Sequence, residues 1–364
     1  MTLTPKRRPI QTAYVGAHLF RAGLPAEWGE LALEAVADCA PDAATLAAAL
    51  DCHVDQHVFA RVKEKLGREP IEDLRIDFED GFGNRSDQEE DGAARSAGAE
   101  VAAGLARLPP FLGIRIKPLA AERATRAGRT LDLFVTSLVE RSGGKLPAHF
   151  TVTLPKVATA EEVTALVRLL AQLESRLQLE AGAFTIELMV ETPRALLGPD
   201  GHCPLPALVT ATGGRCVGVH FGVYDYSAAL GIAPSHHRLR HAACDHARHV
   251  MQVALAGTGI PLSAGSTNVL PVPPPDHLLR AWRLHFQDVR HSLVSGFYHG
   301  WDLHPRQLVT RYVAAYGFLR ECLDQASVGT VLEDPAARDL RANLIRRGLD
   351  CGAISEEEAG AVLP

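Results

Sequence analysis

Three acidic residues crowd into one short segment of the sequence. In LRIDFEDGF, residues 74–82, an apolar start is followed by Asp77, Glu79 and Asp80. A strand that needed only solubility would not gather acids at its downstream end, and charges at a partly buried edge are costly unless they are paired or bind something. We therefore interpret these carboxylates as part of a chemical site in which cations hold them together.

Other apolar segments also end in charged or polar residues. Basic residues close the next two segments along the chain, acids close the two after those, and polar groups close the last two. The candidates are Arg115 and Lys117 in FLGIRIKP, Lys156 in HFTVTLPKV, Glu191 in AFTIELMVE, Asp225 after RCVGVHFGV, Ser266, Thr267 and Asn268 after GIPLSAGS, and Asp302 and His304 in GWDLH.

Two of these acids, Glu191 and Asp225, are the candidates for binding one hard cation. Glu187 and Glu191 share the parity of one strand, but four strand residues separate them by about 13 Å, so they cannot share an ion. Glu191 closes the segment, and Asp225 follows a glycine that lets the chain turn sharply. We predict that Glu191 and Asp225 bind Mg²⁺, with Mn²⁺ as an alternative and with waters and substrate oxygens in the other positions. The carboxylates expected to hold those waters are Asp77, Glu79 and Asp80.

The elements that position these residues alternate between two patterns. Eight β-branched or apolar segments are separated by longer segments with helical periodicity, which predicts repeated βαβ units. We predict a (β/α)8 TIM barrel, with a doubly wound open sheet as the alternative; in such barrels the site lies at the carboxyl ends of the strands. The predicted strands are residues 11–19, 73–80, 111–118, 149–157, 183–191, 215–223, 259–266 and 295–303.

The segments outside the strands predict helices. Two helices are expected between the first two strands, at residues 26–39 and 42–66. Thr159 with Glu162 three residues later is a capping-box pattern at the start of another helix. We assign residues 1–310 to the barrel and residues 311–364 to a helical extension, broken near residue 330, that serves as a lid or an oligomer contact.

Composition excludes several classes of protein. The net charge is −6, and the basic residues are scattered, which argues against a nucleic-acid or acidic-membrane surface. No apolar run approaches the roughly 18 residues of a membrane span, and none follows the basic start as in a signal peptide. Seven widely spaced cysteines without a CxxC pattern indicate free thiols in a reducing compartment. We expect a soluble cytoplasmic protein.

A histidine-rich segment, residues 236–249, offers a competing metal site. If this segment is helical, four of its residues lie on one face at intervals of four, which can bind zinc. The sequence has no HExxH motif, and we interpret the cluster as a solvated or interface face. The four residues are His237, His241, Asp245 and His249.

Six strings occur in the order and spacing of a known family: DFEDG, IRIK, LPKV, VETP, FGVYDYSAALG and GFYHGWDLHPRQ. They resemble the HpcH/HpaI aldolase and citrate lyase β-subunit-like family, in particular an uncharacterised aldolase branch, over about residues 70–310. The resemblance implies a TIM barrel of the phosphoenolpyruvate/pyruvate type, assembled as trimers or hexamers. It implies Mg²⁺ on Glu191 and Asp225, an arginine on substrate oxygens at Arg115, and carbon–carbon chemistry through an enolate.

Several positions depart from that family. Lys117 stands where the family has an asparagine, GWD replaces the usual GK, and the first strand lacks the turn associated with coenzyme A. These differences favour a free 2-oxo or hydroxy acid over a CoA thioester as the substrate. The residues expected to bind the substrate are Arg115, Lys117, Lys156 and Asn268, and the candidates for proton transfer are Asp302 and His304.

The sequence thus predicts a Mg²⁺-dependent lyase or aldolase that acts on a small 2-oxo or 3-hydroxy acid, with a CoA thioester as a variant of the substrate. A Schiff-base aldolase using a desolvated Lys117 or Lys156 is the first alternative. A ligand-binding or regulatory barrel without catalysis is the second. No nucleotide-binding or serine-hydrolase motif occurs in the sequence.

Overall fold

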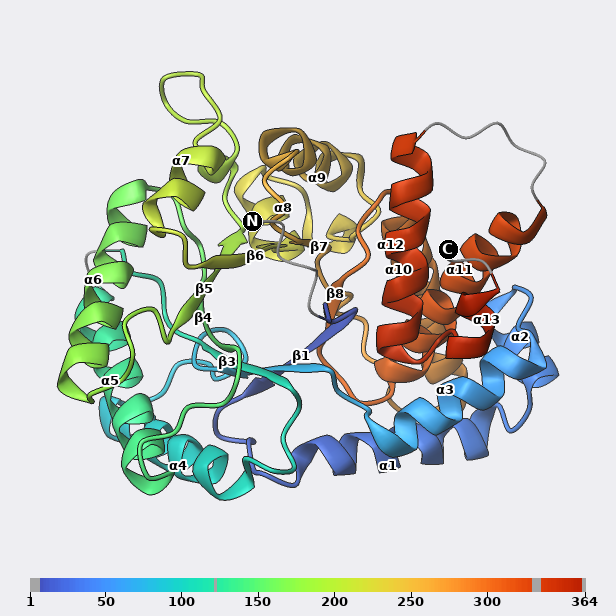
Figure 1. Ribbon diagram of the computed structural model, residues 1–364, viewed down its shortest axis with the longest axis horizontal. Coiled ribbons are helices and arrows are strands. Elements are labelled where there is room, and N and C mark those ends of the chain that lie inside the picture. Colours follow the sequence, from blue (N-terminus) through green and yellow to red (C-terminus); the bar gives the residue numbers. More distant parts are fainter. Residues whose placement is uncertain (1–6, 121–122, 329–334, 362–364) are drawn as a thin grey trace.

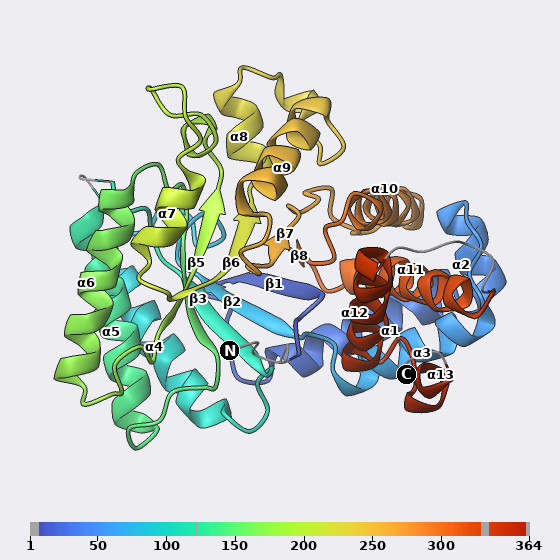
Figure 2. The ribbon, with the colours of Figure 1, turned by 45° about the horizontal axis from the view of Figure 1, so that its top comes forward.

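The computed structural model describes residues 7–120, 123–328 and 335–361, and these residues form a (β/α)8 TIM barrel (Figures 1 and 2). Within them, eight parallel strands follow the order β7-β6-β5-β4-β3-β2-β1-β8. Each strand lies inside the segment predicted for it, which confirms the expected fold class. The strands are β1 Gln11–Gly16, β2 Asp73–Asp77, β3 Phe111–Arg115, β4 Phe150–Leu154, β5 Thr185–Val190, β6 Cys216–Phe221, β7 Leu262–Ser263 and β8 Gly300–Asp302.

The barrel is nearly closed. No ladder joins β7 to β8 in the described part of the chain, but the backbone N–H of Ala264 donates to the carbonyl oxygen of His299 across the gap, at 2.8 Å. β7 is only two residues long, whereas eight residues, 259–266, were expected. Two glycines and a proline in that segment limit regular pairing, because they favour other backbone angles or lack a backbone donor.

The barrel interior holds a buried polar layer centred on a hydrogen-bonded carboxylate. Glu187 lies at its centre and accepts hydrogen bonds from Arg75 at 2.9 Å, Thr153 at 2.8 Å and Tyr14 at 3.2 Å. The ring of His220 lies 2.8 Å from the same carboxylate. Burial raises the pKa of Glu187, but Arg75 and His220 outweigh it and hold the pKa well below its usual range. Glu187 is therefore a structural anion below the strand ends, separate from Glu191.

Helices surround the sheet (Figures 1 and 2). Three helices, not two, connect β1 to β2 among the described residues, because Asp51 ends one helix in a left-handed conformation and Asp55 caps the next. The predicted capping box of Thr159 and Glu162 is confirmed. The helices are α1 Leu24–Cys39, α2 Ala43–Leu50, α3 Gln56–Arg68, α4 Asp87–Gly104, α5 Ala124–Arg141, α6 Ala160–Arg176, α7 Leu205–Ala211, α8 Val223–Ala229, α9 Ala242–Leu255, α10 Pro275–Val294, α11 Gln307–Val328, α12 Pro335–Cys351 and α13 Glu356–Gly360.

Helix α11 packs against α1 and α3, and α2 packs against α10, on the side of the barrel shown at the right of Figure 1. The hydroxyl of Tyr312 in α11 donates to the carbonyl of Pro70 at 2.9 Å, and Arg61 in α3 donates to the carbonyl of Gly352 at 3.1 Å. The expected domain boundary at residue 310 falls inside α11. The expected helix break near residue 330 lies outside the described residues.

No described helix is long and apolar enough to cross a membrane.

Candidate active site

Arg115 and Asp77 form a buried pair at the carboxyl ends of two adjacent strands. The register of β2 and β3 places them side by side. Nε of Arg115 donates to Oδ1 of Asp77 at 2.7 Å, and a second guanidinium nitrogen binds the other carboxylate oxygen. Asp77 also accepts hydrogen bonds from the backbone of Glu79 and Gly81, at 2.9 and 2.7 Å. One carboxylate therefore fixes both the arginine and the turn that carries the other acids.

The remaining edge of the guanidinium faces acids and an aromatic ring. Nη1 of Arg115 lies 3.3 Å from Glu79 and 4.0 Å from Asp80. The guanidinium lies 5.0 Å from the centre of the Tyr14 ring, in a cation–π geometry. Burial disfavours the charged form of Arg115, but Asp77 outweighs it and raises the pKa of the guanidinium above its usual range.

Tyr14 connects the arginine to the polar layer below, and this connection can be tested. Its hydroxyl donates to Glu187 and lies 3.2 Å from Nδ1 of His220. We expect Tyr14→Phe to lower the free energy of unfolding by about 1–2 kcal/mol, because buried acceptors lose a donor. Urea denaturation would measure this. Tyr298→Phe, at the opposite ends of the strands, is the control, and equal stability of Tyr14→Phe and wild type would contradict the expectation.

Lys156 binds four acids at the end of β4. Its backbone is left-handed, with φ of 51°, and its N–H donates to Oε2 of Glu191 at 2.9 Å. Its ammonium contacts Glu79, lies 3.2 Å from Asp80 and lies 2.9 Å from Oδ2 of Asp225. Burial lowers the pKa of Lys156, but Glu79 and Glu191 outweigh it, so the ammonium is held charged.

Glu191 is buried where β5 ends and lies against the chain that leaves β6. A side chain at position 222 would place its Cβ 2.3 Å from Cγ of Glu191, so only glycine fits there. Helix α8 begins directly after Gly222. Asp225 lies in its first turn, and the side chain of Asp225 is 42% exposed. Burial raises the pKa of Glu191, Asp225 raises it further, and Arg115 and Lys156 oppose the shift.

The rim of the barrel therefore carries more negative than positive charge. Five carboxylates face two basic side chains, an excess of three negative charges if all are ionised. Burial raises the pKa of Glu79 to about 7, against the opposing effects of Arg115 and Lys156. Binding of a proton or a cation would therefore reduce the repulsion among these carboxylates and stabilise the rim. The carboxylates are Asp77, Glu79, Asp80, Glu191 and Asp225, and the basic residues are Arg115 and Lys156.

These residues fit a hard divalent cation. In the described part of the chain no group of three or more His, Cys, Asp or Glu residues is arranged to hold a metal. A bound Mg²⁺ would therefore depend on two carboxylates, with waters and substrate oxygens in the other positions, as Mg²⁺ commonly does. Glu191 and Asp225 offer hard carboxylate oxygens, and both contact the same residue, Lys156.

The raised pKa of Glu79 predicts a pH dependence of stability. Folded protein binds a proton at Glu79 more readily than the unfolded chain does, so this group destabilises the fold as pH rises. Relative to Glu79→Gln, the wild type in EDTA is expected to lose up to about 3 kcal/mol of unfolding free energy between about pH 5 and about pH 8. Denaturation over a pH series measures this. A wild type whose stability relative to Glu79→Gln stays constant or increases as pH rises would contradict it.

Lys117 and Asp302 do not join the rim. Nζ of Lys117 binds Glu90 at 2.7 Å and the carbonyl of Phe78 at 2.9 Å. Asp302 is fully buried on the helix-facing side of β8, 3.0 Å from His285 and 2.8 Å from Arg311. The preceding residue, Trp301, faces the barrel interior and packs on Tyr14. We predicted that Lys117 binds the substrate and that Asp302 transfers a proton. The structure corrects both predictions, because each side chain is paired with charged groups away from the rim.

His304 and Asn268 lie in loops that follow the last two strands. Nδ1 of His304 accepts a hydrogen bond from the backbone of Arg306 at 3.2 Å. Burial and the charge of Arg306 lower the pKa of His304 to about 4. The backbone N–H of Asn268 donates to the hydroxyl of Tyr224 at 2.6 Å, and its side chain is exposed. No described contact joins either residue to Arg115 or Lys156.

The histidine cluster does not form the expected helical face. Helix α9 begins at Ala242, so His237 precedes it and His241 caps it. Nε2 of His237 lies 2.7 Å from the carbonyl oxygen of Ile232, while Asp245 lies 2.8 Å from His291. These side chains have separate partners, which removes the basis for a zinc site.

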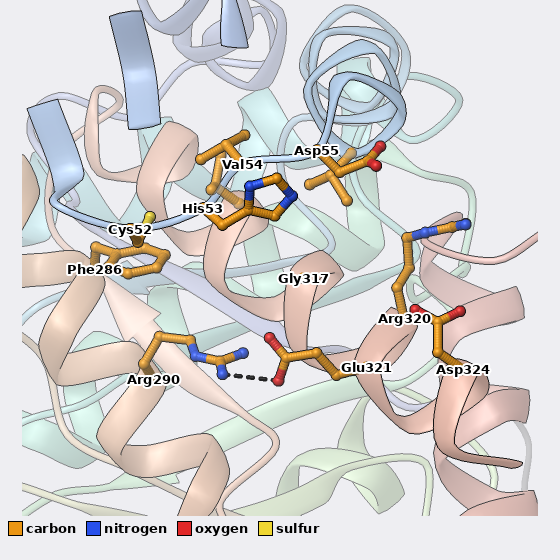
Figure 3. Close-up of a pocket in the computed structure, with 12 residues that line it drawn as sticks. Cys52, His53, Val54, Asp55, Phe286, Arg290, Gly317, Arg320, Glu321 and Asp324 are labelled. Atoms are coloured by element: carbon orange, nitrogen blue, oxygen red, sulfur yellow. Dashed lines mark hydrogen bonds and ion pairs between the residues drawn. The ribbon is translucent and has the colours of Figure 1, made fainter. Parts of the chain in front are cut away.

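A cavity of about 410 Å³ lies away from the rim, beside the loop between α2 and α3 and against α10 and α11 (Figure 3). Arg290 and Glu321 face it and form an ion pair of 2.8 Å. None of the rim residues lines this cavity. It is therefore not part of the candidate active site.

Sequence reasoning missed two residues that shape the rim. Tyr14 alternates with Thr12 and Gly16 on the first strand, so all three face the same side of the sheet. The inward direction of Tyr14 could therefore have been predicted from the strand assignment. Gly222 was noted as a turn residue, but its close approach to Glu191 was not foreseen. That approach depends on how the ends of two neighbouring strands, β5 and β6, lie against each other.

Comparisons with known proteins agree with the fold. A solved structure of native malate synthase from Haloferax volcanii at 3 mM glyoxylate has a TM-score of 0.54 and 13% identity, covering 98% of this chain and 100% of that one. Its magnesium/glyoxylate complex has a TM-score of 0.52 and 14% identity, covering 77% and 83%. RipC from Yersinia pestis has a TM-score of 0.46 and 19% identity, covering 68% and 90%.

At these identities the likeness to the malate synthase structures shows the TIM-barrel fold alone. No curated protein matches the chain. The more specific resemblance to aldolases and citrate lyase β-subunits stays a prediction. Because the match to one family covers residues 3–363, the chain belongs to the family described as Domain of unknown function (DUF6986).

Proposed function

We propose that the protein is a Mg²⁺-dependent lyase or aldolase that makes or breaks a carbon–carbon bond beside a carbonyl, through an enolate. Its substrate is a small 2-oxo or 3-hydroxy acid, either free or as its CoA thioester. One observation carries the proposal: the buried Glu191, the adjacent Asp225 and the fixed guanidinium of Arg115 all face the same acidic rim at the carboxyl ends of the strands.

Glu191 and Asp225 would hold the metal ion. When bound, Mg²⁺ supplies a Lewis acid that polarises a substrate oxygen. Asp80 is partly exposed and Glu79 is buried, and both are suited to hold waters beside the ion.

Arg115 would bind the oxygen on which negative charge develops. Its Nε edge is fully used by Asp77, which fixes the guanidinium plane before substrate arrives. The Nη1 edge is 3.3 Å from Glu79 and is the one directed to the rim. A positioned cation stabilises an enolate oxygen more than a neutral carbonyl, so it lowers the barrier. The ammonium of Lys156 would orient an anionic group of the substrate.

His304 is retained as the proton acceptor. With a pKa of about 4, its ring is neutral near pH 7, but this lowered pKa also makes it a weak base. Asp302 is not retained, because its carboxylate is already paired with His285 and Arg311.

The solved malate synthase neighbour is a complex of magnesium and glyoxylate, which is a 2-oxo acid. That pairing is a property of the neighbour, and it supports testing oxo acids first. From the motif resemblance we also propose a cytoplasmic homo-oligomer, a trimer or hexamer.

A metal-supplemented screen of pyruvate, oxaloacetate and acyl-CoA donors with aldehydes tests the function. We expect turnover that EDTA abolishes and Mg²⁺ or Mn²⁺ restores. Turnover unchanged by EDTA, with a borohydride-trapped adduct on Lys117 or Lys156, would support the Schiff-base alternative. The four acids around Lys156 oppose that alternative, because a charged amine is not a nucleophile. Ligand-dependent melting shifts without any turnover would support a binding protein.

A further inference from the structure

Lys156 already places a positive charge where the proposed metal site lies. Its ammonium lies 2.9 Å from Oδ2 of Asp225, and its backbone N–H lies 2.9 Å from Oε2 of Glu191. One residue therefore contacts both carboxylates of the proposed metal pair. We propose that Lys156 is a tethered counter-cation, which holds Asp225 in the metal-free protein and is displaced from it by the divalent ion. This inference rests on the proposed function.

The backbone keeps the lysine at this place. A left-handed conformation is unfavourable for a residue with a Cβ and usually persists only where surrounding contacts enforce it. Here the N–H must point to Glu191 while the side chain reaches back across the rim to Asp225. Both contacts depend on the same unusual turn, so the ammonium is positioned rather than free to sample the surface.

The surroundings also allow the ammonium to withdraw without losing all its partners. Besides Asp225, it contacts Glu79, whose carboxylate is buried, and Asp80 at 3.2 Å. When Mg²⁺ takes Asp225, repulsion between the two cations disfavours the ammonium at that oxygen. It retains Glu79 and Asp80, so the exchange replaces one contact of three. A monovalent ion gains less at Asp225 than a divalent ion, so the exchange also favours divalent ions.

Titration calorimetry with MgCl₂ tests the exchange. We expect Lys156→Met to bind Mg²⁺ about tenfold more tightly than wild type, because the ion no longer competes with an ammonium. The metal-free variant is expected to melt at a lower temperature, since three carboxylates lose their cation. Lys117→Met is the matched control: it also removes a buried ion pair near a strand end, with Glu90, but leaves Asp225 untouched, so its Mg²⁺ affinity should equal that of wild type.

Salt separates direct competition from a general effect of charge. Exposed charges that are not in contact are largely screened at high ionic strength, whereas contact pairs are screened less. The gain in affinity of Lys156→Met should therefore persist at about 0.5 M NaCl. An affinity that is unchanged or weaker in the variant, or a gain that vanishes in salt, would overturn the exchange.

A measurement on the wild-type protein does not depend on how the variant folds. We expect acylation of the Lys156 amine, followed by peptide mass spectrometry, to accelerate severalfold when Mg²⁺ is added, while Lys117 is unaffected. No change at Lys156, despite calorimetric binding of Mg²⁺, would overturn the inference. If wild type and both variants bind no Mg²⁺ at all, it is the proposed function that fails.

Discussion

Replacing Glu191 with glutamine is expected to abolish Mg²⁺ binding and to lower kcat/KM for carbon–carbon bond cleavage by about a thousandfold or more. The amide keeps the shape of the side chain beside Gly222, and its oxygen can still accept the hydrogen bond of the Lys156 backbone. The substitution removes only the negative charge that would bind the ion. Calorimetry with MgCl₂ and steady-state kinetics with the substrate found in the screen measure the two effects.

The stability of this variant serves as its control. Burial raises the pKa of Glu191, so the charged carboxylate is a cost to the metal-free fold, and the neutral amide should melt no lower than wild type in EDTA. Glu180→Gln, at an exposed position, should retain wild-type binding and turnover. A Glu191→Gln enzyme with wild-type Mg²⁺ affinity would remove Glu191 from the metal site.

Arg115→Lys is expected to lower kcat/KM by about a hundredfold, although the charge is conserved. A lysine ammonium cannot bind both oxygens of Asp77 and at the same time direct a second donor to the rim. The pair in the structure uses Nε and a terminal nitrogen on Asp77, and leaves Nη1 directed to the rim, 3.3 Å from Glu79 and 3.8 Å from Sδ of Met189. Kinetics should show the loss mainly in kcat, because the interaction strengthens as the enolate forms.

A matched substitution separates chemistry from stability. Arg126→Lys alters another arginine that pairs with an aspartate, Asp91, between α4 and α5. It should retain wild-type kinetics while its stability falls modestly. If Arg115→Lys keeps wild-type kcat/KM, the guanidinium acts only as a counter-charge for the acidic rim.

The sequence was sufficient for the architecture because buried parallel strands are continuous apolar runs. All eight segments contain a strand, and strand ends of one barrel meet at one face. That rule predicted one shared site for these residues, and the structure places Asp77 beside Arg115 and Glu191 beside Lys156. Periodicity also predicted the helices, but it did not reveal the interruption near residues 51–55, where single aspartates end and begin helices.

The predictions that failed concern the direction of side chains in short or irregular segments. Asp302 was placed at the rim, but Trp301 pairs in register with Thr12 and faces inward, so its neighbour must face the helices. A strand of three residues gives too little alternation to fix that direction. The left-handed turn at Lys156 has no local signal either, because a lysine there is held by long-range contacts with acids on three other strand ends.

The contact between the first and the last helices has a consequence for synthesis of the protein. Trp28, Phe59 and Val62 of α1 and α3 belong to the buried core, and α11 is the helix that packs against both. A chain emerging from the ribosome folds from its N-terminal end, but α11, which packs against α1 and α3, is translated only after all eight strands. The nascent chain therefore carries α1 and α3 without this contact for most of its elongation, and we expect chaperone binding to it to persist until residues 307–328 have left the exit tunnel.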